Sequence, residues 1–200
     1  MYVPDHFRED RPDVLHEAMR QIAFATLVTS NPSGEPDANH LPMMLDGPVL
    51  RGHVARANPV WKQGDGAALA IFLGPHAYVS PSWYPSMAAT GKAVPTWNYI
   101  TVHARGRVRW IEDADWLRAN VTTLSDEQEA PRPDPWAVRD APETYIATML
   151  RGIVGFEFAI ESLEGKYKLS QNRDAADRAA VREAFLREGR ADIAGLMDRE

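Results

Sequence analysis

Gly52 to Lys62 is the first of several segments whose side chains could hold a ligand, and it runs from the end of a predicted strand into a predicted helix start. Backbone N–H groups are unpaired at such a helix start, and Arg56 and Lys62 add positive charge, so this segment could hold a phosphate. His53 and Asn58 lie in the same segment. A solvated loop with two ordinary surface cations would give the same pattern, and no glycine-rich loop indicates a P-loop.

A long stretch without regular periodicity runs from Pro81 to about Trp97, and polar and aromatic side chains flank it. These side chains are Ser80, Ser82, Trp83, Tyr84, Thr96, Trp97, Asn98 and Tyr99. A planar heteroaromatic ligand needs such a combination of stacking surfaces and a few polar groups. Loops of this length tend to be functional. A dimer interface would use the same aromatic residues, so both interpretations stay open.

A further segment, from Leu163 to Arg173, carries the cations Lys166, Lys168 and Arg173 just before a helix predicted to begin at Asp174. These cations could contact a phosphate of a cofactor or of DNA. They could equally belong to a solvated helix start.

His40, His53 and His103 all lie on predicted strands, but no carboxylate stands at a supporting spacing. We therefore predict no metal site and expect these rings to form hydrogen bonds near a ligand or an interface. No nucleophile and base stand out as a pair, so the sequence assigns no catalytic residue.

The composition excludes several classes of protein. Of the 200 residues, 44% are hydrophobic and 25% charged, which is ordinary for a soluble globular protein. No apolar stretch approaches the roughly 20 residues of a membrane span, and the N-terminal segment has no signal-peptide core. There is no cysteine for a disulfide, a thiol nucleophile or a cysteine metal site. A formal charge of −6 does not favour a protein that coats nucleic acid. We expect a cytoplasmic protein without membrane contact.

The periodicity of apolar residues predicts a mainly β chain. Strands are expected over residues 24–29, 38–45, 49–54, 67–73, 77–80, 99–111 and 153–161, with a bulge at Gly106. Helices are expected over residues 10–22, from Asp113, from Pro142 with Tyr145, Ile146, Met149 and Leu150 inward, from Asp174, and near Ile193. Residues 126–140 are expected to form an exposed linker. No βαβ rhythm appears, so we predict a small antiparallel barrel with peripheral helices.

Five motifs in this order resemble the PaiB family, whose members are usually described as negative transcriptional regulators. They are YVPDHF at 2–7, GHVARANP at 52–59, YVSPSWYP at 78–85, VPTWNYITVH at 94–103 and EGKYKLSQNR at 164–173. The resemblance extends from Tyr2 to about Arg182, and residues 189–200 match nothing. One departure is the loop Ser86–Lys92, which carries a single cation where the family has a longer polar or basic stretch.

The resemblance implies an FMN-binding split β-barrel, similar to pyridoxamine phosphate oxidase and flavin reductases. Such proteins form homodimers with two flavins at the interface. By position, the segment around Arg56, Asn58 and Lys62 would hold the FMN phosphate, with His53 beside it. Ser80–Trp83 and Thr96–Asn98 would approach the flavin, and one of these segments could come from the partner subunit.

The domain division expected on this basis is a split barrel over residues 1–165, with a helical insertion near 113–150. A C-terminal helical extension, residues 166–200, would pack on the same domain.

Three functions fit this resemblance. The first is a flavin-binding regulator of gene expression, and the second is an FMN-dependent oxidoreductase that acts on a small substrate with NAD(P)H. The third is a haem-binding or non-catalytic split barrel. The predicted helices form no helix-turn-helix, so DNA as a partner rests on the resemblance alone.

Overall fold

The computed structural model describes residues 1–198, over which the chain forms eight strands and six α-helices. The strands are β1 (Arg8–Glu9), β2 (Phe24–Ser30), β3 (Pro36–Pro42), β4 (Met44–Asp46), β5 (Val49–Ala55), β6 (Gly66–Val79), β7 (Thr96–Ile111) and β8 (Ile153–Lys168). The helices are α1 (Pro12–Ile22), α2 (Pro85–Thr90), α3 (Ala114–Glu129), α4 (Glu143–Arg151), α5 (Ala175–Arg187) and α6 (Ala191–Leu196). Short 3-10 turns are η1 (Asp5–Phe7), η2 (Pro59–Gln63), η3 (Pro81–Trp83) and η4 (Val138–Asp140). The prediction of a mainly β protein with peripheral helices is confirmed.

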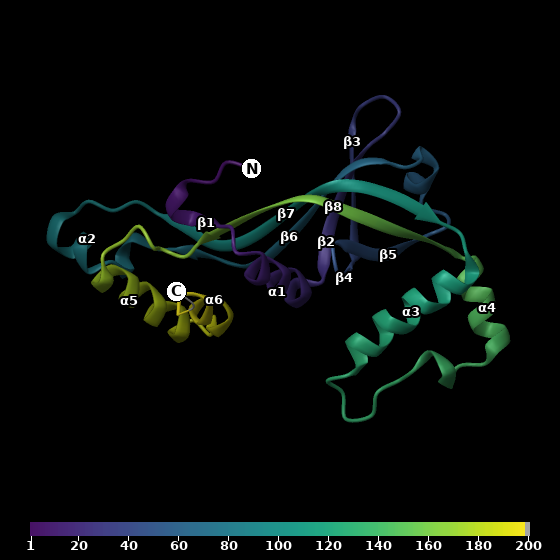
Figure 1. The fold of residues 1–200 in the computed structure, drawn as a ribbon. Helices are drawn as coiled ribbons and strands as arrows, with labels where there is room; N and C mark the ends of the chain where they lie inside the picture. The colour runs from purple at the N-terminus through teal and green to yellow at the C-terminus, as the bar shows by residue number, and fades with distance from the viewer. Residues whose placement is uncertain (199–200) are drawn as a thin grey trace. The chain divides into compact units, whose positions relative to one another are not determined.

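The strands form one sheet in the order β3-β2-β6-β7-β8-β5-β4, and β1 pairs with β8 outside this path. The long strands β6, β7 and β8 run side by side through its middle (Figure 1). β2 pairs antiparallel with β3 and β6, and β5 pairs antiparallel with β4 and β8. Strands β3 and β4 are the two ends of this path, so the sheet is not closed.

The chain divides into two compact units, and the long strands contribute residues to both. Residues 19–71 and 104–162 form the first, which we name the barrel unit. Residues 1–18, 72–103 and the segment from 163 onward form the second, which we name the terminal unit. This grouping cuts across the domain boundary predicted at residue 165, which stays a prediction.

Glycine lets strands of the barrel unit approach each other closely. A side-chain carbon on Gly52 of β5 would lie 2.9 Å from the Pro42 carbonyl oxygen of β3, although β3 and β5 share no ladder. A side-chain carbon on Gly106 of β7 would lie 1.9 Å from the Ala159 carbonyl oxygen of β8. Gly106 thus lies inside an uninterrupted strand, and close backbone approach, rather than the expected bulge, explains why glycine stands there.

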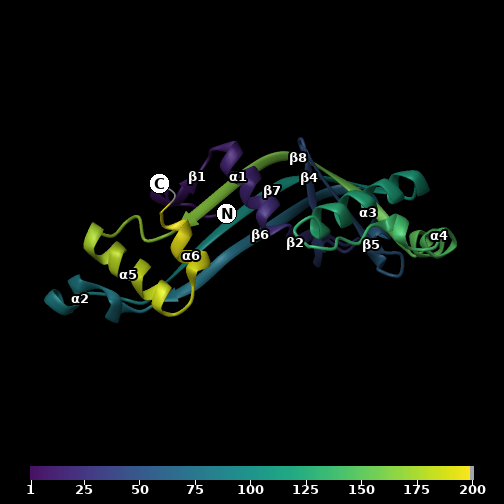
Figure 2. The ribbon, with the colours of Figure 1, turned by 90° about the horizontal axis from the view of Figure 1, so that it is seen from below.

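Helices α3 and α4 lie beside each other in the insertion that joins β7 to β8 (Figure 2). Asp113 caps α3 by accepting a hydrogen bond from the Trp116 amide at 2.8 Å, as a helix start at this residue requires. The buried residues of the insertion are Leu117, Val138, Ile146 and Leu150.

Two expectations for this insertion are wrong. Tyr145 and Met149 are exposed, because the short helix α4 buries only the stripe on which Ile146 and Leu150 lie one turn apart. Residues 126–140 are not simply a linker, since α3 continues to Glu129 and Val138 is buried.

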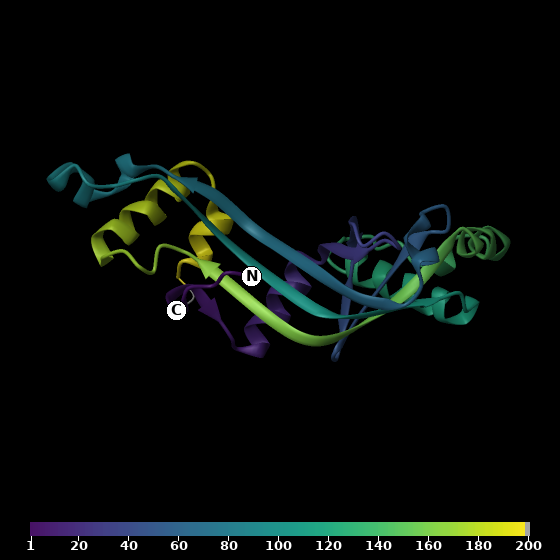
Figure 3. The same ribbon diagram turned by 90° about the horizontal axis from the view of Figure 1, so that it is seen from above.

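In the terminal unit, α2, α5 and α6 lie close together (Figure 3). Asp174 caps α5, as predicted, by accepting from the Asp177 amide. The buried Asp177 carboxylate accepts from the Ser86 amide at 3.0 Å and from the Ser86 hydroxyl at 2.6 Å at the start of α2. The stretch after Pro81 is therefore more ordered than expected, because η3 and α2 form within it.

Strand β8 also continues seven residues past the predicted end at Glu161, to Lys168. Its extension pairs with β1 at Gly165 and Lys166, which a local sequence pattern does not reveal.

Candidate functional site

Arg56 follows β5, and its guanidinium is already engaged within the barrel unit. Nε donates to the Arg151 carbonyl oxygen at 2.8 Å, and Nη2 donates to that of Ile153 at 3.1 Å. Nη1 donates to the Glu112 carboxylate at 2.5 Å. These contacts tie the end of β5 to the start of β8 and leave few donors for a phosphate. A phosphate-binding role for Arg56 stays a prediction.

Asn58 precedes the turn η2 and Lys62 lies within it, and this turn stands where a helix start was expected. The Asn58 side chain accepts from the Val60 amide at 3.0 Å and donates to the Asn39 side chain at 2.6 Å, so it caps the turn. Lys62 is exposed, with its ammonium 5.8 Å from the centre of the Trp61 ring. Over residues 1–198 no carboxylate lies within ion-pair distance of Lys62, so its charge is free for an anion.

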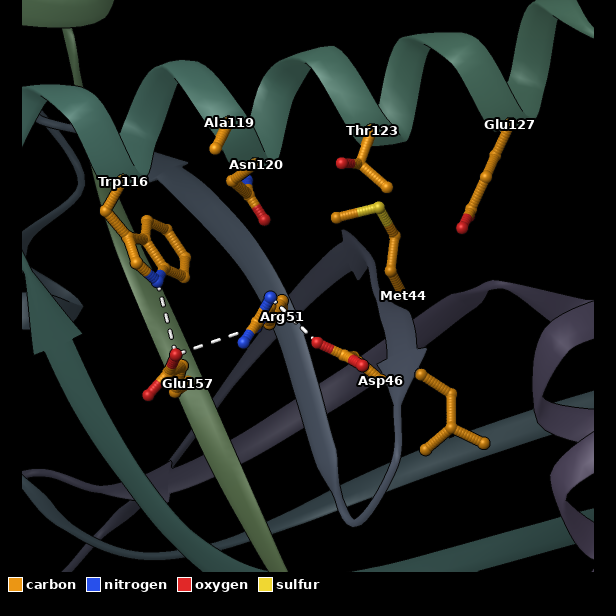
Figure 4. A pocket seen from close by; sticks show the side chains of 10 residues that line it. Met44, Asp46, Arg51, Trp116, Ala119, Asn120, Thr123, Glu127 and Glu157 are labelled. Carbon is orange, nitrogen blue, oxygen red and sulfur yellow. Dashed lines mark hydrogen bonds and ion pairs between the residues drawn. The ribbon is translucent and has the colours of Figure 1, made fainter.

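A pocket of about 380 Å³ lies inside the barrel unit, between α3 and the hairpin of β4 and β5 (Figure 4). Its lining residues are Met44, Leu45, Asp46, Arg51, Trp116, Ala119, Asn120, Thr123, Glu127 and Glu157. Most of them project from α3 or from the strands toward a common space (Figure 4).

Asn120 links this pocket to the predicted residue His53. The side-chain nitrogen of Asn120 lies 3.4 Å from His53 Nδ1, and Asn120 is only 4% exposed. Its side-chain oxygen has no hydrogen-bond partner among the described residues and points into the pocket (Figure 4). Burial lowers the pKa of His53, which keeps the ring neutral near pH 7. The pocket thus offers an unpaired acceptor to a ligand N–H group.

The opposite wall of the pocket is an ionic network. Arg51 lies 2.8 Å from the Asp46 carboxylate and 3.5 Å from that of Glu157. Trp116 and Arg109 both donate to Glu157, at 3.2 and 2.7 Å. Burial opposes the ionisation of Glu157, but these hydrogen bonds and the charges of Arg109 and Arg51 outweigh it and lower its pKa. The carboxylate therefore stays ionised and is already paired.

Sequence reasoning missed Trp116 and Asn120 as pocket residues. They stand one helical turn apart on α3, so their spacing places them on one face of that helix. The apolar periodicity of this helix predicts which face packs inward and gives no signal for this polar and aromatic stripe.

The serines predicted to approach a flavin lie at the end of β6 in the terminal unit. Ser80 accepts from the Ser82 amide at 3.3 Å and caps η3, and the two hydroxyl oxygens are 2.8 Å apart. Trp83 packs edge-on against Phe185 of α5, with ring centroids 5.4 Å apart. Local capping and packing therefore account for these contacts.

Thr96, Trp97 and Asn98 begin β7 in the same unit and differ sharply in exposure. The Trp97 side chain is 52% exposed and lies beside the rings of Tyr78 and His76, at centroid distances of 6.1 and 6.3 Å. Asn98 is fully buried and accepts from the Ser170 hydroxyl at 3.1 Å. Thr96 and Asn98 line a recess together with residues of the segment from Leu163 to Arg173, including Lys168 and Arg173.

The predicted residues thus fall into two sets. In the barrel unit they are His53, Arg56, Asn58 and Lys62. In the terminal unit they are Ser80, Ser82, Trp83, Thr96, Trp97 and Asn98. Over residues 1–198, no three His, Cys, Asp or Glu side chains converge as metal ligands. In that same range no helix has both the length and the apolar character needed to cross a membrane.

Comparison with known proteins gives consistent results. The family model described as "Putative FMN-binding domain" matches residues 1–162. The "Protease synthase and sporulation protein PAI 2" of Bacillus subtilis (strain 168) is 34% identical over 194 residues, covering 94% of this chain and 90% of that protein.

Two solved structures share the fold. The FAD and heme binding protein from Mycobacterium smegmatis has a TM-score of 0.59 at 15% identity and covers 86% of this chain and 78% of its own. The flavocytochrome Anf3 from Azotobacter vinelandii has a TM-score of 0.57 at 14% identity and covers 89% of this chain and 78% of its own.

The open antiparallel sheet, with helices at its periphery, defines the class of FMN-binding split barrels, as predicted. The chain belongs to the FMN-binding domain family whose model spans most of it, and the resemblance to the PaiB family is confirmed. FMN is accordingly its cofactor. Each unit carries groups of the kind that FMN needs, since the Lys62 ammonium has no carboxylate partner among residues 1–198 and the Trp97 ring is half-exposed, but the assignment of these residues to the flavin stays a prediction.

Proposed function

We propose that the protein is a homodimeric, FMN-dependent regulator of gene expression. The observation that carries this proposal is the 34% identity to the sporulation protein PAI 2 over 94% of the chain, together with membership of an FMN-binding family. A regulator of this kind meets its partners inside the cell, so we assign it to the cytoplasm. The flavin would act as the sensor, and its occupancy or redox state would alter what the protein binds.

We propose that residues of each set contact flavin, and that the two subunits of a homodimer supply them together, as the family resemblance implies. Asn58 and Lys62, with Arg56 and His53 beside them, would hold the phosphate end. Ser80, Ser82, Trp83, Thr96, Trp97 and Asn98 would orient the ring system and exclude water from it. When bound, FMN itself supplies the electron-transfer chemistry, and the chain supplies binding and orientation.

The C-terminal helices do not favour direct contact with DNA. Arg182 pairs with Asp198 at 2.7 Å and Arg190 pairs with Asp192 at 2.9 Å, so these cations are partly neutralised. Phosphate contacts need cations that can exchange their counterions for DNA.

The experiment is a transcription profile of a strain that lacks the gene, complemented with wild type or with a flavin-deficient variant. We expect a defined set of transcripts to rise in the deletion strain and to fall only with the flavin-binding form. Purified protein is then assayed for NAD(P)H turnover and for salt-dependent DNA binding. Rapid NAD(P)H turnover together with an unchanged transcription profile would contradict the regulator and favour the FMN-dependent oxidoreductase.

A further inference from the structure

A recess in the terminal unit concentrates hydrogen-bond donors and positive charge. It has a volume of about 190 Å³, and we name it the Lys168 recess. Its lining residues are Tyr84, Val94, Pro95, Thr96, Asn98, Lys168, Ser170, Asn172 and Arg173. No Asp or Glu is among them, so the recess is basic although the whole chain carries a formal charge of −6.

The two cations of the recess are held by neutral groups only. The Lys168 ammonium donates to the Thr96 hydroxyl and, at 2.9 Å, to the Trp97 carbonyl oxygen. The Arg173 guanidinium carbon lies 4.3 Å from the centre of the Tyr84 ring. Among the described residues neither cation has a carboxylate within ion-pair distance. Burial, followed by the charges of Lys166 and Arg173, lowers the pKa of Lys168, so these cations are close enough to repel each other.

The Tyr84 hydroxyl is a further donor that lacks a partner. Tyr84 is 2% exposed, and within residues 1–198 its hydroxyl makes no hydrogen bond. A buried polar group without a partner is costly and is uncommon in native proteins. Because Tyr84 lines the recess beneath the Arg173 guanidinium, an acceptor bound in the recess would satisfy both residues.

The backbone at the recess is held in an unusual conformation. Ser170 has a φ of +66°, in the left-handed region that residues other than glycine rarely adopt. Its hydroxyl donates to the buried Asn98, and its carbonyl oxygen accepts from the Arg173 amide at 3.0 Å. Such local strain persists where the surrounding structure fixes it and is frequent at ligand-binding sites. Here it sets the turn that brings Arg173 back beside Lys168.

We propose that the Lys168 recess binds a phosphate group through Lys168, Arg173 and the Tyr84 hydroxyl. Two cations balance a dianion, and guanidinium with phosphate forms paired hydrogen bonds. A carboxylate would neutralise only one of the two cations. The inference does not depend on flavin binding, because free phosphate alone probes it. The phosphate can belong to FMN or to a second phosphorylated ligand, and the experiment separates these sources.

The test is calorimetric titration of inorganic phosphate into the purified full chain, before and after saturation with FMN. We expect Arg173→Gln to weaken phosphate binding by about 10- to 100-fold, as the loss of a charge-assisted hydrogen bond requires. Tyr84→Phe should weaken it several-fold, and the melting temperature of this variant shows whether it is folded. Lys92→Gln removes the same charge from an exposed loop of the terminal unit and should leave phosphate binding unchanged.

Two arms identify the source of the phosphate. If FMN saturation blocks phosphate binding, and Arg173→Gln weakens FMN but not riboflavin, the recess holds the FMN phosphate. If phosphate binds equally well to the FMN-saturated protein, the recess serves a second ligand. The proposal is overturned if wild type binds no phosphate at millimolar concentration, or if folded Arg173→Gln and Tyr84→Phe proteins bind it as wild type does.

Discussion

At the scale of single residues, Arg56 and Lys62 are both cations of one segment, but they differ in the contacts that their charged groups make in the structure. The Arg56 guanidinium donates hydrogen bonds to Glu112 and to two carbonyl oxygens, whereas the Lys62 ammonium has only the Trp61 ring beside it. Both were predicted to hold the FMN phosphate. The structure therefore makes their substitutions distinguishable by stability as well as by affinity.

Lys62→Ala should weaken FMN binding by about 10-fold or more and leave the melting temperature unchanged, since only a free cation is lost. Arg56→Ala should lower the melting temperature, because it removes the tie between β5 and β8. Fluorescence titration of FMN and riboflavin, with thermal unfolding of each variant, measures both effects. Riboflavin lacks the phosphate and serves as the control. Unchanged FMN affinity in Lys62→Ala would remove this lysine from the phosphate site.

His53 gives the protein a predictable pH dependence. Burial holds its pKa below the ordinary 6.5, so the unfolded chain takes up a proton before the folded chain does. The free energy of unfolding should consequently fall as the pH drops below 6.5, with a slope of up to about 1.4 kcal/mol per pH unit from this ring, and level off below the folded pKa. His53→Gln should flatten that slope in urea unfolding measured between about pH 7 and pH 5, because the variant has no imidazole to protonate. An equally steep slope in the variant would assign the effect to other groups.

At the scale of elements, much of the strand and helix order could be predicted because it rests on local periodicity. β2, β5 and β7 follow from alternating apolar residues, and Asp113 and Asp174 mark helix starts by their capping chemistry. What local patterns do not contain is the pairing of distant segments. The extension of β8 depends on β1, and the order after Pro81 depends on Asp177 of α5.

The same limit applied to the candidate site. The unpaired Asn120 oxygen and the unpaired Tyr84 hydroxyl are properties of packing, and composition cannot reveal them. Arg56 showed the reverse, since a charge that looked available in the sequence is engaged by Glu112 and by carbonyl groups far along the chain.

The strand scale also supplies a stability prediction. Gly106→Ala should destabilise the barrel unit by about 2 kcal/mol or more, because the added carbon meets the Ala159 carbonyl oxygen of β8. Gly66→Ala is the matched control. Gly66 is the first residue of the long strand β6, and no atom lies within 4 Å of the added carbon. We expect the control to be neutral or slightly stabilising. Equal chemical-denaturation midpoints for the two variants would contradict the close approach of β7 and β8.

At the scale of the whole molecule, exposed apolar side chains of the terminal unit support the proposed homodimer. Leu73, Tyr78, Val94 and Trp97 are 53%, 46%, 68% and 52% exposed. Aromatic and apolar groups of this kind are enriched at the centres of protein interfaces, and a second copy would cover them.

Leu73→Glu should therefore shift the protein from dimer to monomer in light scattering at micromolar concentration. Met149→Glu, at a residue 47% exposed in the barrel unit, adds the same charge elsewhere and should leave the dimer intact. If the wild type is a monomer under these conditions, the proposed homodimer is wrong. A dimer that survives Leu73→Glu but not Met149→Glu would move the interface to the barrel unit.

The terminal unit is assembled from the first, the middle and the last parts of the chain, and this has a consequence for synthesis on the ribosome. The barrel unit gains its last strand when β8 emerges. β1 is made about 150 residues earlier and lacks its partner until then, because Arg8 pairs with Lys166. Residues 72–103 likewise lack their neighbour α5 until residues 175–187 have been made. Contacts this distant along the chain form slowly. A nascent chain would thus leave Trp83 without its Phe185 neighbour until α5 has been made, and chaperones that bind apolar segments should recognise the chain until then.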